Sequence, residues 1–233
     1  MNRIIHVARI QLVNAKMVIG FPLFILLFVL AANIVLFLAA PFPEPEQGSS
    51  PTGALMSIYI ATMILHVQTM TQMFPYALGM SITRRDFLAA AGLVVVGQAL
   101  LYGVALSVLR LIETATNGWG VGVAMFDLPF LEVSNPVMQV LVYAGPFLLL
   151  SFAGLWAGVV YQRWGQLGVW ILSLSLAALL IGAAALVGWR NWWPEVGSFF
   201  ADTPTPVLLF VYPVVLAAVF AGSTYFTTRR ATA

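Results

Sequence analysis

The chain alternates between long runs of apolar residues and short polar segments. Six of these runs contain no Asp, Glu, Lys or Arg and extend for about 20 residues or more. A helix of about 20 residues covers the roughly 30 Å of hydrocarbon in a bilayer, so each run predicts a transmembrane helix. We expect these spans at Phe21–Ala40, Ala54–Leu78, Phe87–Leu109, Val137–Val160, Leu167–Val187 and Val207–Thr227.

The segment before the first span has a different pattern. Ile4, Ile5, Ala8, Leu12 and Ala15 fall on one side of a helical wheel, with His6, Arg9 and Lys16 beside them. This pattern predicts a basic helix over residues 1–19 that lies along the membrane interface. A basic leader with a chance pattern is the alternative.

The predicted fold class is therefore all-α. We expect one transmembrane domain over residues 1–233, in which the interfacial helix precedes a six-helix bundle at 20–230. Between the third and fourth spans, the loop from Arg110 to Asn135 is apolar enough to fold back onto the membrane surface, and the sequence leaves open whether it does so.

Composition supports a bilayer as the solvent. The 233 residues are 61% hydrophobic and 8% charged, with a mean hydropathy of +0.98, and no water-soluble fold could bury that much apolar surface. The chain has no Cys, which excludes disulfides, thiolate nucleophiles and Cys-ligated metals.

Charges are segregated between alternate loops. If the N-terminus is cytoplasmic, the inner segments hold a single acid, Asp86, and the bases Arg3, Arg9, Lys16, Arg84, Arg85, Arg163, Arg229 and Arg230. The outer segments hold Arg110, Arg190 and the acids Glu44, Glu46, Glu113, Asp127, Glu132, Glu195 and Asp202. The positive-inside rule then predicts that both termini are cytoplasmic. The orientation of the chain in the membrane accounts for the excess of basic residues. We therefore expect no nucleic-acid partner.

The chain lacks the residues that several kinds of catalytic site require. A P-loop needs a lysine after a glycine, whereas the only lysine, Lys16, follows Ala15. The only histidines, His6 and His66, are 60 residues apart, so they cannot form a zinc-protease helix motif. We therefore expect no catalytic residues, no metal and no cofactor in this chain. An intramembrane enzyme that depends on His66 is a weaker alternative.

The second span carries a polar face. Thr62, His66, Thr69 and Gln72 recur at helical spacing, so their side chains project into one sector. These residues are candidates for lining a pathway between two subunits. Hydrogen bonding between packed helices is the alternative explanation.

Small residues predict close helix packing elsewhere. Gly154 and Gly158 form a GxxxG motif, in which two glycines one turn apart let another helix approach closely. Three further pairs have the same spacing, namely Ala99/Gly103, Ala178/Gly182 and Ala218/Gly222.

The turn between the second and third spans is the most distinctive polar segment. It reads MFPYALGMSITRRDFLAAAG, and Thr83 and Asp86 have the spacing of a helix N-terminal capping box before an apolar run. Arg84 and Arg85 either anchor the hairpin to anionic headgroups or form a surface for a partner.

This order of features resembles the permease subunit of ABC-2-type (type V-like) ABC transporters. The topology is similar over the whole chain, and the motif is similar over residues 72–92. The resemblance implies that the turn at 79–87 is a coupling helix that docks into an ATPase subunit, with Ser81, Thr83, Arg84, Arg85, Asp86 and Phe87 as coupling residues. It also implies two ATPase copies that bind ATP and Mg, a second permease copy or paralogue, and a bacterial plasma membrane.

The favoured hypothesis from the sequence is thus an exporter permease without enzymatic activity of its own. The alternative is a membrane scaffold or accessory subunit with no transport path, in which the polar face of the second span only packs against neighbouring helices.

Overall fold

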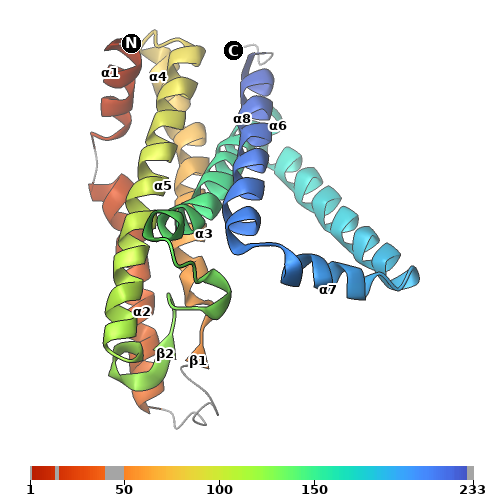
Figure 1. Cartoon of the computed structure of the whole chain (residues 1–233). Coiled ribbons are helices and arrows are strands. Elements are labelled where there is room, and N and C mark those ends of the chain that lie inside the picture. Colours follow the sequence, from red (N-terminus) through yellow and green to blue (C-terminus); the bar gives the residue numbers. More distant parts are fainter. Residues whose placement is uncertain (1, 14–15, 40–49, 230–233) are drawn as a thin grey trace.

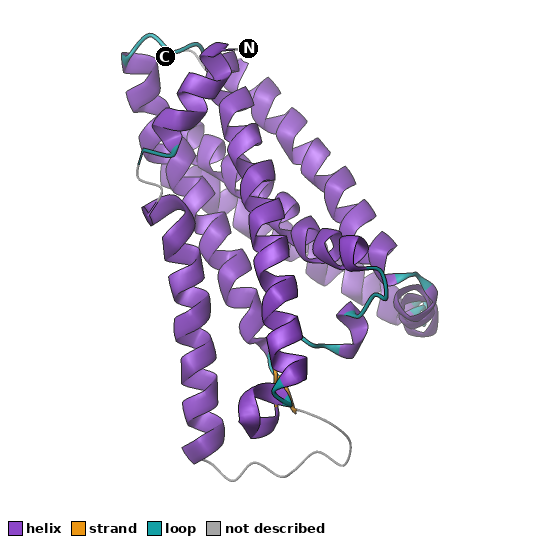
Figure 2. Cartoon of the chain, turned by 60° about the vertical axis from the view of Figure 1, so that its left-hand side comes forward, coloured by secondary structure: helices purple, strands orange, loops and turns teal. Residues whose placement is uncertain are grey.

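The computed structural model describes residues 2–13, 16–39 and 50–229, and these are almost entirely helical (Figure 1, Figure 2). The described strands are β1, Ser50–Pro51, and β2, Val123–Ala124, which pair in parallel. The predicted all-α class with several long apolar helices is therefore confirmed.

The first half of the chain forms an amphipathic helix and three long helical segments. Their parts are α1 (Asn2–Gln11), η1 (Lys16–Gly20), α2 (Phe21–Ala39), η2 (Gly53–Leu55), α3 (Met56–Gln68), η3 (Thr69–Met73), α4 (Phe74–Gly79) and α5 (Arg84–Ala115). The second half consists of η4 (Gly118–Gly122), η5 (Pro129–Leu131), α6 (Pro136–Trp189), α7 (Trp193–Asp202), η6 (Val207–Val211) and α8 (Tyr212–Arg229).

Five helical segments of the described chain are long and apolar enough to cross a membrane. They are Lys16–Ala39, Gly53–Gly79, Arg84–Ala115, Pro136–Trp189 and Val207–Thr228. Four of them contain the predicted first, second, third and sixth spans, except that Ala40 lies outside the described residues. The predicted fourth and fifth spans both fall within α6.

Gly165 divides α6. The helix has 54 residues, which corresponds to about 81 Å, far more than one crossing requires. At Gly165 the backbone has φ 65° and ψ −157°, a conformation open almost only to glycine. The chain bends there, and Figure 1 shows the arm at 166–189 leaving the bundle. Most side chains of that arm are exposed within the single chain.

The first arm of α6 is the centre of the bundle and packs against α3, α5 and α8. Glycines allow the closest approaches. A Cβ atom at Gly154 would lie 2.5 Å from the carbonyl oxygen of Met63, and one at Gly103 would lie 2.6 Å from that of Val140. The predicted packing at the GxxxG motif and at Ala99/Gly103 is confirmed, because such distances exclude any side chain.

The other two pairs of small residues make no such contact among the described residues. A Cβ atom at Gly182 or Gly222 would meet no atom within 4 Å. Gly182 lies on the second arm of α6, and Gly222 lies on α8.

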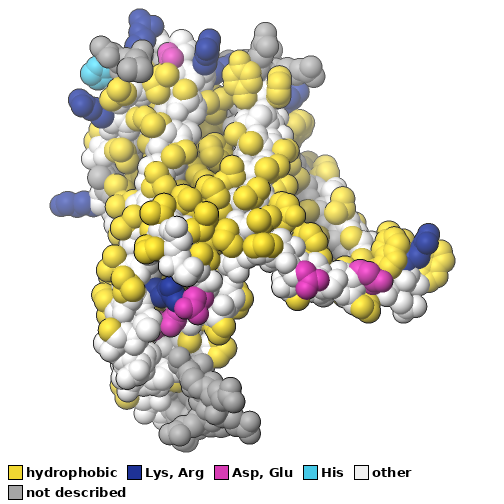
Figure 3. Space-filling model, viewed as in Figure 1, with side chains coloured by type: hydrophobic (Ala, Val, Ile, Leu, Met, Phe, Trp, Pro, Cys, Tyr) yellow, Lys and Arg dark blue, Asp and Glu magenta, His cyan; other side chains and the backbone are white. Residues whose placement is uncertain are grey.

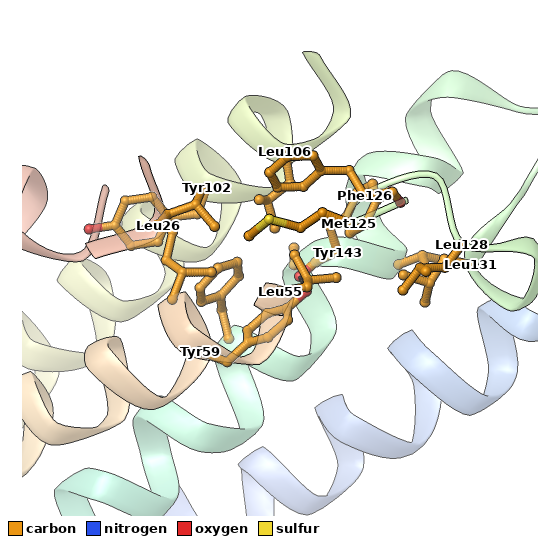
Figure 4. Packing of buried hydrophobic residues seen from close by; sticks show 14 of the residues in the cluster. Leu26, Leu55, Tyr59, Tyr102, Leu106, Met125, Phe126, Leu128, Leu131 and Tyr143 are labelled. Atoms are coloured by element: carbon orange, nitrogen blue, oxygen red, sulfur yellow. Dashed lines mark hydrogen bonds between the residues drawn. The ribbon is translucent and has the colours of Figure 1, made fainter. Parts of the chain in front are cut away.

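The largest buried cluster includes the loop between α5 and α6. Met125 and Phe126 are fully buried with Tyr59 of α3, Tyr102 of α5 and Tyr143 of α6, and Figure 4 shows how these side chains meet. The Tyr143 hydroxyl donates to the carbonyl of Phe126 at 2.7 Å. The loop that the sequence left open thus inserts into the bundle.

A buried carboxylate holds this loop in place. Glu113, 2% exposed near the end of α5, accepts hydrogen bonds from the backbone N–H groups of Met125, Phe126 and Asp127, and from the indole of Trp119. Beside it, Arg110 forms an ion pair with Asp127 at 2.7 Å. Backbone groups that no strand or helix would satisfy therefore find a charged acceptor.

We expect Gly154→Ala to lower the free energy of unfolding by about 1–3 kcal/mol, because the added methyl group collides with the backbone of α3. Gly97→Ala is the matched control, since Gly97 lies on an exposed face with no atom within 4 Å of the added carbon. Unfolding titrations in mixed detergent micelles measure both. Equal stability of the two variants would contradict the packing described here.

We expect Glu113→Gln to destabilise the protein by about 1–3 kcal/mol, because an amide would point its NH₂ group at backbone or indole donors in either orientation. The loop at 116–131 should also become more sensitive to protease. Glu195→Gln removes the same charge at an exposed position and should change neither property. Equal protease sensitivity in the two variants would argue against this anchor.

Candidate functional site

The turn between α4 and α5 is short and rigidly built. The N–H of Ile82 donates to the carbonyl of Ala77 at 3.1 Å, and the N–H of Ser81 donates to that of Leu78 at 3.0 Å. This pair of bonds is a Schellman motif, which ends α4. The motif requires a left-handed residue, and Ser81 takes this place with φ 60°, where glycine is usual.

The next helix begins at once with its own cap. The Thr83 hydroxyl accepts a hydrogen bond from the N–H of Asp86 at 3.1 Å, as the Thr-x-x-Asp spacing predicts. Thr83 itself is extended, with φ −70° and ψ 146°. The two helices are thus capped on both sides of a connection that spans residues 80–83.

Two of the candidate residues support the turn from within. Phe87 is 1% exposed, and its ring lies edge-on to that of Phe74, with 5.1 Å between the centroids. Arg84 is half-buried, and its Nη1 donates to the carbonyl of Thr228 at 3.0 Å. Phe87 therefore joins α4 to α5, and Arg84 joins the turn to the end of α8.

The other candidate residues are accessible. Ser81, Thr83 and Arg85 are exposed, and Asp86 is half-buried. Figure 1 shows the turn at the same end of the molecule as α1 and the end of α8, and in Figure 3 Lys and Arg side chains gather at that end. The turn between α4 and α5 is therefore basic and exposed, and hydrogen bonds fix its backbone. Such a surface can bind a protein partner of complementary charge.

The predicted polar face of the second span is divided in the structure. Thr62, His66 and Thr69 are buried within the single chain, whereas Gln72 is exposed. Thr62 and Thr69 bond to carbonyls of their own helix, those of Ile58 at 2.7 Å and Leu65 at 3.0 Å. Their role as pathway-lining residues stays a prediction.

His66 belongs to a buried polar group that the sequence did not reveal. Its imidazole lies beside Gln98 of α5, yet neither ring nitrogen has a hydrogen-bond partner of good geometry among the described residues. Gln98 donates to the carbonyl of Val18 at 2.7 Å, and the hydroxyl of Tyr102 donates to that of Ile19 at 3.1 Å. These bonds attach the start of the first span to α5. Because the partners lie about 80 residues apart in sequence, no local pattern could have indicated them.

Within the described part of the chain, no three His, Asp or Glu side chains lie close enough together to hold a metal ion. No protein-family model, curated protein or solved structure matches the chain.

We expect Ser81→Gly to raise the free energy of unfolding by about 1 kcal/mol, because glycine adopts a positive φ without the steric cost that a Cβ atom imposes. Ser107→Gly, within α5, should instead lower stability by about 1 kcal/mol. Thermal unfolding of both variants in detergent gives the comparison. A loss of stability in both would show that Ser81 does not have the left-handed conformation.

Proposed function

We propose that this chain is the permease subunit of an ATP-binding-cassette exporter. It crosses the bacterial plasma membrane six times, with the two arms of α6 as separate crossings and both termini in the cytoplasm. Two separate ATPase subunits bind ATP and Mg, and a second copy of the permease or a paralogue completes the transport path.

The single observation that carries the proposal is the turn at 79–87. Its sequence resembles the coupling segment of ABC-2-type permeases, and its backbone is fixed by a Schellman motif and an N-cap. Ser81, Thr83 and Arg85 are the exposed residues for contact with the ATPase, while Arg84 and Phe87 position the turn. Thr83 also caps α5 by accepting a hydrogen bond from the N–H of Asp86, which is half-buried.

In the proposed mechanism, the turn transmits the movement of the ATPase subunits to the permease. Closure of the ATPase subunits on ATP displaces the turn, and the second and third spans tilt with it because they are capped directly onto it. The tilt opens a path between the two permease copies. Thr62, His66, Thr69 and Gln72 are the candidates to line that path, with Gln72 accessible before any movement.

We expect Arg85→Glu to abolish co-purification with the ATPase subunit that binds the unmodified chain, while the variant still inserts and folds. Arg85 is preferred to Arg84 for this test, because Arg84 also bonds to the end of α8 and its substitution would disturb the fold. Arg9→Glu is the matched control, since it makes the same change of charge at an exposed position on α1. ATPase recovered in equal yield with Arg85→Glu and with the unmodified chain would refute the proposed docking site.

A further inference from the structure

The inner half of the second span contains a turn of π-helix, η3, between the α-helical parts α3 and α4. In a π-helix each N–H bonds to the carbonyl five residues earlier, and the N–H of Phe74 donates in this way to the carbonyl of Thr69. In an α-helix the same N–H would bond to the carbonyl of Met70. The π-helical donor to Met70 would be residue 75, which is Pro75 and has no N–H. The carbonyl of Met70 therefore has neither an α-helical nor a π-helical donor.

A side chain from another helix supplies the missing donor. The amide of Gln162, near the end of the first arm of α6, donates to the carbonyl of Met70. Gln162 follows Gly154 and Gly158 at intervals of four residues, so all three lie on one face of α6. A Cβ atom at Gly158 would lie 2.6 Å from that of Met70, so this face meets η3 closely. Gln162 thus satisfies a carbonyl that would otherwise be unpaired in a fully buried residue.

The start of the first span has a similar arrangement that differs in one respect. η1 is also a π-helical turn and is followed by Pro22, so the carbonyl of Val18 lacks its α-helical donor. The amide of Gln98 donates to this carbonyl at 2.7 Å, and Gln98 is buried. Gln162, in contrast, is exposed beside the bend of α6. Its amide can therefore exchange the carbonyl of Met70 for solvent, whereas Gln98 has no such alternative partner.

The inner part of the second span also has room to move. Gln68 and Gln72 are two residues from Met70 in either direction, which places them about 160° around the helix from it. On their side, the span borders a cavity of about 620 Å³, and α1 and the start of the first span form the facing wall. The inner part of the span therefore contacts α6 on one side and open space on the other.

We propose that η3 is a hinge in the second span and that Gln162 is the residue that keeps it closed. While Gln162 bonds to Met70, α4 and the turn at 80–83 stay in the position described above. When this bond is exchanged for solvent, the inner part of the span swings away from α6 into the cavity, and the turn moves with it. π-helical turns and prolines are the positions where helices bend most readily. The hinge is a property of this chain alone, so it does not rest on the proposed transport function.

The test measures the position of the turn in the full-length protein in phosphatidylcholine vesicles. Because the chain has no Cys, Met80→Cys and Val219→Cys provide unique sites for a pair of nitroxide spin labels, and both positions are exposed. Val219 lies on α8, which packs against α6. A bend of about 20° at η3 displaces position 80, about 15 Å further along the helix, by about 5 Å. In Gln162→Leu we therefore expect the distance distribution to broaden toward longer values by up to about 5 Å.

Two further variants separate a hinge from a general loss of packing. Gln166→Leu removes an exposed amide on the other side of the bend in α6 and should leave the distribution unchanged. Pro75→Ala restores a backbone N–H that can supply the donor to Met70, so it should cancel the effect of Gln162→Leu. Gln162 and Pro75 are exposed, so neither replacement puts folding at risk.

Three outcomes would overturn the proposal. They are an unchanged distribution in Gln162→Leu, equal broadening in Gln166→Leu, and broadening that persists when Pro75→Ala is combined with Gln162→Leu. The vesicles contain no ATPase, so the result is independent of the docking site proposed at Arg85.

Discussion

A backbone N–H or C=O group that is withdrawn from water must find its partner inside the protein, and within hydrocarbon this holds for every such group. Helices satisfy this requirement along their length. Other partners are needed only for the backbone groups at the positions where a helix ends. At residues 77–86 the Schellman bonds and the Thr83 cap satisfy the exposed backbone groups. At the other end of α5, the carboxylate of Glu113 does the same for three consecutive N–H groups of an inserted loop. The two ends of one helix thus meet the same requirement with different chemistry.

Features that depend on local sequence could be predicted. The apolar runs indicated the helices, the Thr-x-x-Asp spacing indicated the cap of α5, and the GxxxG motif indicated where another helix comes close. Features that depend on distant partners could not. The burial of Met125 and Phe126 depends on Glu113 and on tyrosines from three helices, and the burial of His66 depends on the approach of α6. The polar face of the second span looked uniform on a helical wheel, because a wheel does not show that a neighbour covers only part of it.

The last third of the second span belongs to two neighbouring features, the cavity and the turn. It carries Gln68 and Gln72 on the wall of the cavity, and it ends in the turn that bears Arg85. α1 contributes to both regions, because Val7 and Ile10 line the cavity and Gln11 bonds to the carbonyl of Phe87. Whatever occupies the cavity therefore contacts the same helices that position the turn.

The continuity of α5 has a mechanical consequence. The helix runs without interruption for 32 residues, about 48 Å, from the capped turn to the glutamate that grips the inserted loop. Because the helix has no internal break, a displacement of the turn at its start would be transmitted to its other end and to the loop that Glu113 holds there. The position of the loop at 116–131 would then change with the position of the turn at 80–83.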